Sequence, residues 1–367
     1  MARTALLRIV LALGTAAASA APAAAETGAA PVRKLEAIWT TAVPGKPAEG
    51  YLYGWRLRVQ RDNGVSLAAG STLITLDASG KIRRCALLAA RQTESYSSIP
   101  LEGGDFLVQP NAAGVGPMRL ARLTADGAAR FTAQERLPKD LVSILHDAVL
   151  LPNGRIAAAV SYGPGPNIEL GLLVFDAAGR RLGDHRTTIF MPASEGLTRL
   201  FPRARDGAVE GVTVLGMGSR PAGFGPFMKR FTFTGEVPVA TEAEFLGERS
   251  HLLCGAMNAG GAVIVAAAEG ESEDRPVTLR WFDDGGEQTE FATVGAAERC
   301  QIAMRADGAS LVLLAPRTLL AFDGEAKPLW RAELPDDAAA IGWMSDGDIV
   351  AVHQTARGAA AVRYLAQ

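Results

Sequence analysis

The sequence predicts an all-β fold in which seven four-stranded antiparallel sheets are arranged in a ring. Three observations predict it. Glycine-containing turns recur about every 47 residues along the chain. The segments between the turns are short and apolar, as expected for strands. Finally, the last unit lacks one strand, and a surplus strand is present near the N-terminus.

The turns fall into two sets that share glycine and, in most cases, Asp or Asn. The first set precedes the second strand of each unit, at Gly64, Gly104, Gly154, Gly207, Gly261, Gly308 and Gly347. The second set follows the third strand, at Gly80, Gly127, Gly179, Gly235, Gly285 and Gly324. Asp, Asn and Gly tolerate the left-handed backbone of hairpin turns. We therefore interpret these acidic residues as turn formers, because the D-x-D-x-D-G spacing of a calcium loop is missing.

Short apolar segments between these turns have the composition of strands. The clearest are Ile156–Val160, Leu172–Phe175, Val263–Ala266, Val277–Phe282, Leu311–Leu314 and Leu319–Phe322. Units of four such strands at this period are typical of propeller blades, which cannot bury their faces alone. Seven turns in the first set predict a seven-bladed β-propeller.

The two ends of the chain predict how the ring closes. The last unit has strands at Ala340–Met344, Ile349–His353 and Ala360–Leu365, and the chain then stops one strand short. The segment Lys34–Thr41 has apolar residues at alternate positions, Leu35, Ala37 and Trp39. As the outer strand of the last blade it would complete the ring and remove two free sheet edges.

The first residues have the order of a secretory signal. Arg3 and Arg8 flank or enter the start of an apolar stretch, which passes into small residues with Ala-x-Ala sites that end at Ala20 and Ala25. An amphipathic or membrane-spanning helix is the alternative, but the apolar part is shorter than the ~20 residues that span a bilayer. We expect residues 1–25 to be a signal peptide, residues 26–367 a single domain, and the mature chain to be periplasmic or secreted without a membrane span.

The composition excludes several classes of function. The 37 Lys and Arg residues nearly balance the 39 Asp and Glu residues, which leaves a net charge of −2. A nucleic-acid binder would carry a basic excess, so no nucleic-acid partner is expected. The sequence also lacks H-E-x-x-H, G-x-S-x-G and the phosphate-binding glycine loops. We therefore predict no catalytic residues, no metal and no cofactor.

Two segments resemble a known repeat. Ala148–Ile156, with Leu-Pro-Asn-Gly at its centre, and Arg119–Gly127 look like the two halves of the bacterial delta-60-type repeat. The chain is also similar, more loosely, to other exported seven-bladed propellers, WD40-like proteins among them, although the Trp-Asp ends of WD repeats are missing. The resemblance implies a propeller fold and carries no reaction with it.

The first residues of the innermost strands should surround one mouth of the central channel. Counting back from the turn glycines gives basic residues or histidines in five blades: Arg56, His146, Arg199, His251 and Arg299. Such a ring would focus positive potential, so we predict an anion-binding mouth. In the alternative, these side chains solvate the rim or pair with Asp147, Glu195 and Glu298.

A Gly- and Pro-containing segment, Met217–Lys229, is predicted to be a long loop on the same face. It mixes aromatic and basic residues, namely Arg220, Phe224, Phe227 and Lys229, which is the composition of a contact patch for a protein partner. Alternatively, it is a solvated lid with its phenylalanines turned inward.

Three cysteines allow at most one intramolecular disulfide. Aligning the repeats places Cys254 and Cys300 on opposite faces of their strands, which is the arrangement that lets one blade reach its neighbour. The geometry allows a Cys254–Cys300 bridge only if the two Cα atoms lie within ~7 Å.

These patterns favour an exported binding or interaction module that recognises an anionic ligand or a protein partner at the channel mouth. Two alternatives stay open. One is a hydrolase or lyase with His146 or His251 as general base and Arg199 or Arg299 holding a carboxylate. The other is a noncatalytic subunit of a periplasmic dehydrogenase.

Overall fold

The computed structural model describes most of the chain after the N-terminal segment. Its described parts are residues 25–26, 30–44, 54–88, 96–110, 116–135, 142–163, 167–192, 198–205, 208–220, 223–235, 237–241, 243–246, 250–269, 276–297, 299–355 and 358–366. Within these parts the regular elements are β-strands, apart from one 3-10 turn, η3 (Pro152–Gly154).

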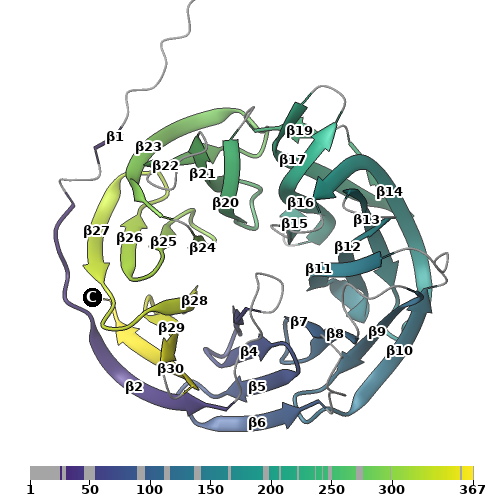
Figure 1. Cartoon of the computed structure of the whole chain (residues 1–367), viewed down its shortest axis with the longest axis horizontal. Helices are drawn as coiled ribbons and strands as arrows, with labels where there is room; N and C mark the ends of the chain where they lie inside the picture. The colour runs from purple at the N-terminus through teal and green to yellow at the C-terminus, as the bar shows by residue number, and fades with distance from the viewer. Residues whose placement is uncertain are drawn as a thin grey trace, which may run out of the picture.

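Seven four-stranded antiparallel blades surround a central axis, and the first strand of each blade lies innermost (Figure 1). Blades 1 and 2 contain β3 (Arg56–Val59), β4 (Val65–Ala69), β5 (Thr72–Leu76), β6 (Ile82–Leu87), β7 (Tyr96–Pro100), β8 (Phe106–Pro110), β9 (Met118–Leu123) and β10 (Ala129–Glu135). Blades 3 and 4 contain β11 (Val142–Leu150), β12 (Ile156–Gly163), β13 (Asn167–Phe175), β14 (Arg181–Pro192), β15 (Arg199–Arg205), β16 (Ala208–Arg220), β17 (Gly223–Thr234) and β18 (Val237–Ala240).

The remaining three blades complete the ring. Blades 5 and 6 contain β20 (Ser250–Met257), β21 (Val263–Glu269), β22 (Pro276–Phe282), β23 (Gln288–Ala296), β24 (Cys300–Met304), β25 (Ser310–Leu314), β26 (Thr318–Phe322) and β27 (Pro328–Glu333). Blade 7 contains β28 (Ala338–Trp343), β29 (Ile349–Thr355), β30 (Gly358–Leu365) and the N-terminal β2 (Glu36–Val43). The predicted seven-bladed β-propeller is confirmed.

The N-terminal strand closes the ring as predicted. Strand β2 pairs antiparallel with β30, from Glu36 opposite Leu365 to Val43 opposite Ala359. It runs along the perimeter beside the C-terminal strand (Figure 1). One detail of the prediction is wrong, because the register shifts between Ala37 and Trp39. This β-bulge interrupts the expected alternation, so that Ala37 is exposed while Trp39 packs against the core.

Trp39 contacts the turn between β5 and β6 of blade 1. Its indole Nε1 donates a hydrogen bond to the carbonyl of Ala78 over 3.1 Å, and Thr41 Oγ1 donates to the carbonyl of Gly80 over 2.6 Å. Gly80 has φ +83°, and a Cβ there would lie 2.5 Å from Trp39 Cδ2. Glycine is therefore required at Gly80 for both the turn and the close approach of the indole.

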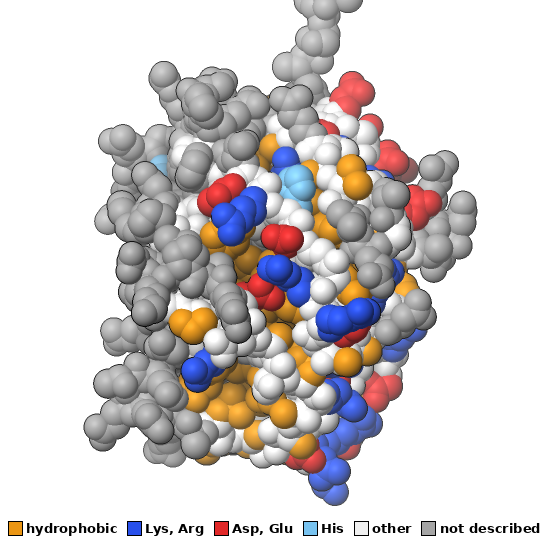
Figure 2. Space-filling view, turned by 90° about the vertical axis from the view of Figure 1, so that its right-hand side faces the viewer, with side chains coloured by type: hydrophobic (Ala, Val, Ile, Leu, Met, Phe, Trp, Pro, Cys, Tyr) orange, Lys and Arg blue, Asp and Glu red, His pale blue; other side chains and the backbone are white. Residues whose placement is uncertain are grey.

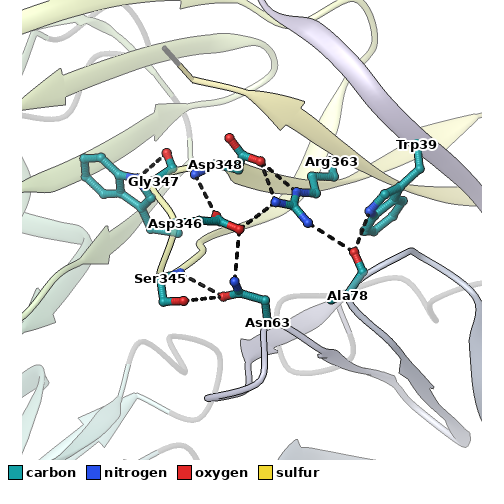
Figure 3. Close-up of polar contacts among 9 residues, drawn as sticks. Trp39, Asn63, Ala78, Ser345, Asp346, Gly347, Asp348 and Arg363 are labelled. Atoms are coloured by element: carbon teal, nitrogen blue, oxygen red, sulfur yellow. Dashed lines mark hydrogen bonds and ion pairs between the residues drawn. The ribbon is translucent and has the colours of Figure 1, made fainter.

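Polar side chains join blade 7 to blade 1 next to this contact (Figure 3). Arg363 binds Asp348 through Nε over 2.8 Å, Asp346 through Nη2 over 2.6 Å, and the Ala78 carbonyl through Nη1 over 3.1 Å. Asn63, in the first turn of blade 1, donates to Asp346 Oδ2 over 3.0 Å and accepts from the Ser345 backbone over 2.9 Å. Residues nearly 300 positions apart thus fasten the first blade to the last.

The hydrophobic core lies between adjacent blades. Between blades 2 and 3, for example, the rings of Phe131 and Phe175 stack with centroids 6.5 Å apart. Between blades 7 and 1, the fully buried Leu67 and Ile74 belong to the same cluster as Val350 and Val352. Each blade therefore depends on its neighbours to bury its faces, which is the physical reason for a closed ring.

The segment predicted as a long loop in blade 4 is an extended hairpin instead. Strands β16 and β17 stay paired from Gly211 opposite Thr232 to Arg220 opposite Gly223. A short strand, β19 (Glu244–Phe245), adds to β17. The Gly and Pro residues that indicated a loop are accommodated because cross-strand pairing satisfies the backbone of the neighbouring residues.

Two further features concern the outer surface. Strand β1 (Ala25–Glu26) pairs parallel with β23 at the outer edge of blade 5. On the side shown in Figure 2, acidic and basic side chains lie next to one another between hydrophobic patches. Separately, Arg181 Nη1 on β14 forms an ion pair with Glu135 Oε2 on β10 at 2.7 Å, which joins the outer strands of blades 3 and 2. Among the described residues no helix has the length and apolar character to cross a membrane.

Candidate functional site

A cavity of ≈ 860 Å³ lies among the inner strands, and residues from the first strand of each of the seven blades line it. Its volume is in the range typical of small-molecule sites. The charged side chains among its described lining residues are Arg56, Arg58, Arg199, Arg299 and Asp147. Four arginines and one aspartate give this cavity a formal charge of +3, in a chain whose net charge is −2.

A second and larger hollow, of ≈ 1270 Å³, lies at the turn-bearing ends of blades 1 to 4. Five basic and five acidic residues line it, so its charge is balanced. Several of them already form ion pairs, such as Arg130 with Asp105 at 2.6 Å and Arg83 with Asp62 at 3.0 Å. The central cavity is therefore the better candidate site for a charged ligand.

Three elements bring Arg56, Asp147 and Arg199 to one wall of the cavity. Arg56 begins β3, Asp147 lies on β11, and Arg199 begins β15. Arg56 Nη1 lies 3.9 Å from Asp147 Oδ1. The other carboxylate oxygen of Asp147 accepts the backbone N–H of Leu200 over 2.9 Å. Asp147 thereby links blades 1, 3 and 4. In the sequence analysis, ion pairing with acidic residues is the alternative to anion binding, and Arg56 does form such a pair with Asp147. Glu195 and Glu298, its other proposed partners, lie outside the described residues.

His146 is fully buried beside this wall and does not line the cavity. It is the extra residue of a β-bulge, since Leu145 pairs with Val160 and Asp147 with Ala159. Its Nε2 lies 2.6 Å from Ser161 Oγ. Burial, with Arg56 and Arg199 nearby, lowers the pKa of His146 from 6.5 to about 3. A buried, neutral imidazole has neither access to a ligand nor the proton affinity of a general base.

The buried state of His146 predicts a loss of stability in acid. Its pKa in the folded state lies below the ordinary value, so between pH 6.5 and about 3 the unfolded chain binds a proton that the folded chain excludes. Stability should therefore fall as the pH falls through this window, by up to about 1.4 kcal/mol per pH unit. Urea unfolding at pH 7, 6 and 5 measures this slope.

The His146→Gln variant is the control, because burial also lowers the pKa values of His185 and His353. Glutamine keeps a partner for Ser161 but does not titrate. The free energy of unfolding of the variant should depend less steeply on pH than that of the wild type. Equal slopes for the two proteins would contradict the assignment of a depressed pKa to His146.

The last two residues of the predicted basic ring, Arg299 and His251, differ in whether they line the cavity. Arg299 directly precedes β24, has an exposed side chain and lines the cavity. His251 lies in β20 opposite Ala268, is partly buried, and is not among the described lining residues. Three of the five predicted residues, Arg56, Arg199 and Arg299, thus share one cavity.

A disulfide also lines the central cavity. Cys254 on β20 and Cys300 on β24 are bonded, with Cα atoms 5.6 Å apart, and both line the cavity. The bond connects the inner strands of blades 5 and 6. Because Arg299 is adjacent to Cys300, the disulfide also holds the backbone that carries this arginine. Cys85, the third cysteine, is exposed on β6.

The structure changes the interpretation of the proposed contact patch. Phe227 is fully buried and Lys229 is 9% exposed, so neither presents a surface to a partner. Both lie on β17, whose inward-facing residues pack in the core. For Phe227 the alternative given in the sequence analysis, a phenylalanine turned inward, is therefore the one observed. The backbone of Arg220 and Phe224 forms the end of the β16–β17 hairpin, and their side chains lie outside the described residues.

Sequence reasoning missed several residues that line the cavity. Arg58 lies two residues after Arg56, and its Nε donates to the Pro100 carbonyl over 2.9 Å. Gln301 accepts the Ile341 N–H over 3.1 Å and so connects blades 6 and 7. Trp55 and Trp343 contribute aromatic surface. The alternation of Arg56 and Arg58 along one strand was the signal that could have pointed to Arg58. Among the described residues no cluster of three or more His, Cys, Asp or Glu could hold a metal ion.

No model of a known protein family matches the chain, and no curated protein matches it. Solved structures do share the fold. A chain from the crystal structure of BBS1N in complex with ARL6DN, soaked with mercury, matches with a TM-score of 0.56 at 12% identity, covering 91% of this chain and 97% of that one. A chain of the mitotic checkpoint complex matches with a TM-score of 0.56 at 11% identity, covering 98% and 99%.

The solved structure of an enzyme also matches. The quinohemoprotein alcohol dehydrogenase ADHIIG from Pseudomonas putida HK5 matches with a TM-score of 0.52 at 11% identity, covering 90% of this chain and 76% of that one. Identities this low establish a shared fold and leave function open. The propeller is thereby supported, while the resemblance to the delta-60-type repeat stays a prediction.

Proposed function

We propose that this propeller is a binding module that recognises an anionic group in its central cavity. The observation that carries the proposal is that Arg56, Arg199 and Arg299, from blades 1, 4 and 6, line one cavity in which Asp147 is the single acidic residue among those described. The cavity is therefore strongly cationic although the whole chain is slightly acidic.

Guanidinium groups suit this task for two reasons. Arginine stays charged at all physiological pH values and presents a planar fork that matches a carboxylate or a phosphate. In a recessed site with low-dielectric walls, the fields of neighbouring cations add and are weakly screened by solvent. Asp147 neutralises part of this charge and orients Arg56, but three positive charges remain in excess.

Isothermal titration with citrate, succinate and inorganic phosphate tests the proposal. We expect at least one of these anions to bind, and the Arg199→Ala variant to bind it about 10- to 100-fold more weakly, which is the range for losing a charge-assisted hydrogen bond. Arg180→Ala is the matched control, because Arg180 is largely exposed on the outer turn of blade 3. No heat with any of the three anions, or equal losses in the two variants, would contradict the proposal.

The similar folds support an interaction role in a general way. Two of the matching solved structures are protein complexes by their own descriptions. We therefore propose that the bound anion is either a small molecule or an acidic group of a protein partner, and that the end of the β16–β17 hairpin, with Arg220 and Phe224, contacts such a partner.

Export from the cytoplasm is the proposed location of this activity. The N-terminal order of basic, apolar and small residues supports it, and so does the Cys254–Cys300 disulfide, because such bonds persist in oxidising compartments. The mass of the mature protein recovered from a periplasmic or culture fraction tests this directly. Export predicts a chain that starts after Ala20 or Ala25, and a full-length cytoplasmic chain would contradict it.

A further inference from the structure

The central cavity is chemically different at its two ends. The inner strands all run in the same direction, so their first residues lie at one end of the cavity and their last residues at the other. We call the end with the first residues the loop end. We call the end with the last residues the turn end, because the hairpin turn to the second strand of each blade follows it. At the turn end Met257 pairs with Val263, Met304 with Ser310, and Trp343 with Ile349.

Three of the four cavity arginines lie at the loop end. Arg56 and Arg199 are the first residues of β3 and β15, and Arg299 immediately precedes β24. Arg58 lies further along β3, where its guanidinium is bonded to the Pro100 carbonyl of blade 2 through Nε. The three loop-end arginines come from three separate blades, 1, 4 and 6, and all line the cavity.

The turn end is lined by apolar side chains. Val59, Met257, Met304 and Trp343 are the last residues of their strands and line the cavity. The indole Nε1 of Trp343 donates to the Gly347 carbonyl over 2.9 Å, so its polar atom is satisfied, and the Arg305 guanidinium lies over its ring, 5.4 Å from the centroid. Methionine is flexible and polarisable, and adapts to ligands of varied shape.

The distance between the two ends accommodates more than a small anion. Met304 is the last residue of the five-residue strand β24, five positions after Arg299. At ~3.4 Å per residue this corresponds to about 17 Å. A compact anion such as phosphate would use the loop end alone and leave the apolar end of the cavity filled with water, which is unfavourable.

We propose that the natural ligand is an amphiphilic anion, with one carboxylate or phosphate head held by the loop-end arginines and an apolar tail against Met257, Met304 and Trp343. This inference rests on the proposed anion-binding function and specifies the class of its ligand. The head gives orientation and electrostatic attraction, while burial of the tail supplies affinity in proportion to its area.

Calorimetric titration of the full mature chain with acetate, hexanoate, decanoate, decyl phosphate and decanol tests the inference. Affinity should rise about three- to fourfold per added CH₂ along the carboxylates until the tail fills the cavity. Decanol, which has the tail without the charge, should bind at least about tenfold more weakly than decanoate. The comparison of decanoate with decyl phosphate tells a carboxylate head from a phosphate head.

Variants separate the two ends of the cavity. Met304→Gln keeps the length of the side chain and should weaken decanoate about fivefold or more while leaving citrate or phosphate binding unchanged. Leu329→Gln is the matched control, since Leu329 is 43% exposed on the outer strand β27. The fluorescence of Trp55 and Trp343, which line the cavity, gives a second readout that does not depend on a variant.

The possible outcomes distinguish this inference from the function on which it rests. If short and long carboxylates bind with equal affinity, and Arg199→Ala lowers the affinity for both, the proposed anion binding is supported and the proposal of an amphiphilic ligand is wrong. If decanol binds as tightly as decanoate, the arginines do not select a head group and the inference is wrong. If none of the anions binds, the proposed function itself fails.

Discussion

Replacing both Cys254 and Cys300 by serine is expected to lower the free energy of unfolding by about 4 kcal/mol. The two residues are 46 positions apart, and the bond between them removes the entropy of closing that loop from the unfolded chain. The expected loss is large because total stabilities of domains are themselves only about 5–15 kcal/mol. Urea unfolding without reductant, comparing the double variant with the wild type, measures it.

Cys85→Ser is the matched control for this substitution. Cys85 is exposed on β6 and forms no disulfide, so its replacement should change stability by less than about 0.5 kcal/mol. The disulfide also predicts a single reactive thiol in the denatured, unreduced protein. Three reactive thiols under those conditions would mean that the bond between blades 5 and 6 does not form.

Trp39→Ala is expected to cost about 3 kcal/mol, at the lower end of the range for large aromatic residues because Trp39 is only partly buried. The substitution removes the indole that packs on Gly80 and its hydrogen bond to the Ala78 carbonyl. Both contacts cross from blade 7 to blade 1, so the loss falls on the closure of the ring. Thermal and urea unfolding of the variant measure the effect.

Ile38→Ala, one residue away on the same strand, provides the comparison. Ile38 is 48% exposed at the β-bulge, so its replacement should cost less than about 1 kcal/mol. A loss for Trp39→Ala as small as that for Ile38→Ala would show that β2 contributes little to holding the ring closed. Such a result would also remove the physical reason for pairing an N-terminal strand with the C-terminal one.

The sequence predicted the strands and the closure because the signals for both are local. Turns with Asp, Asn and Gly mark hairpins wherever they occur, and the strands between them are recognised by short apolar composition. For the same reason the prediction for Met217–Lys229 was wrong. Its Gly and Pro residues indicated a loop, whereas pairing with the opposite strand extended the hairpin through them.

The candidate site was predicted in part. Counting from the turns selected Arg56, Arg199 and Arg299, which lie at or beside the starts of their inner strands and line one cavity, while their role in binding stays a prediction. His146 was counted in the same way and is instead buried, because a β-bulge adds one residue to β11. A shift of one residue reverses the face to which a strand side chain points.

The sequence by itself determined the number of blades, the positions of their turns and the pairing of the N-terminal segment with the last blade. These properties follow from a repeated local pattern and from the strand that the last repeat lacks. Only the tertiary structure decided which side chains share the central cavity and which contacts fasten blade 1 to blade 7. Asn63 and Arg363, which lie near opposite ends of the chain, both bind the carboxylate of Asp346. No local sequence pattern encodes such a contact, because it depends on the curvature of the closed ring.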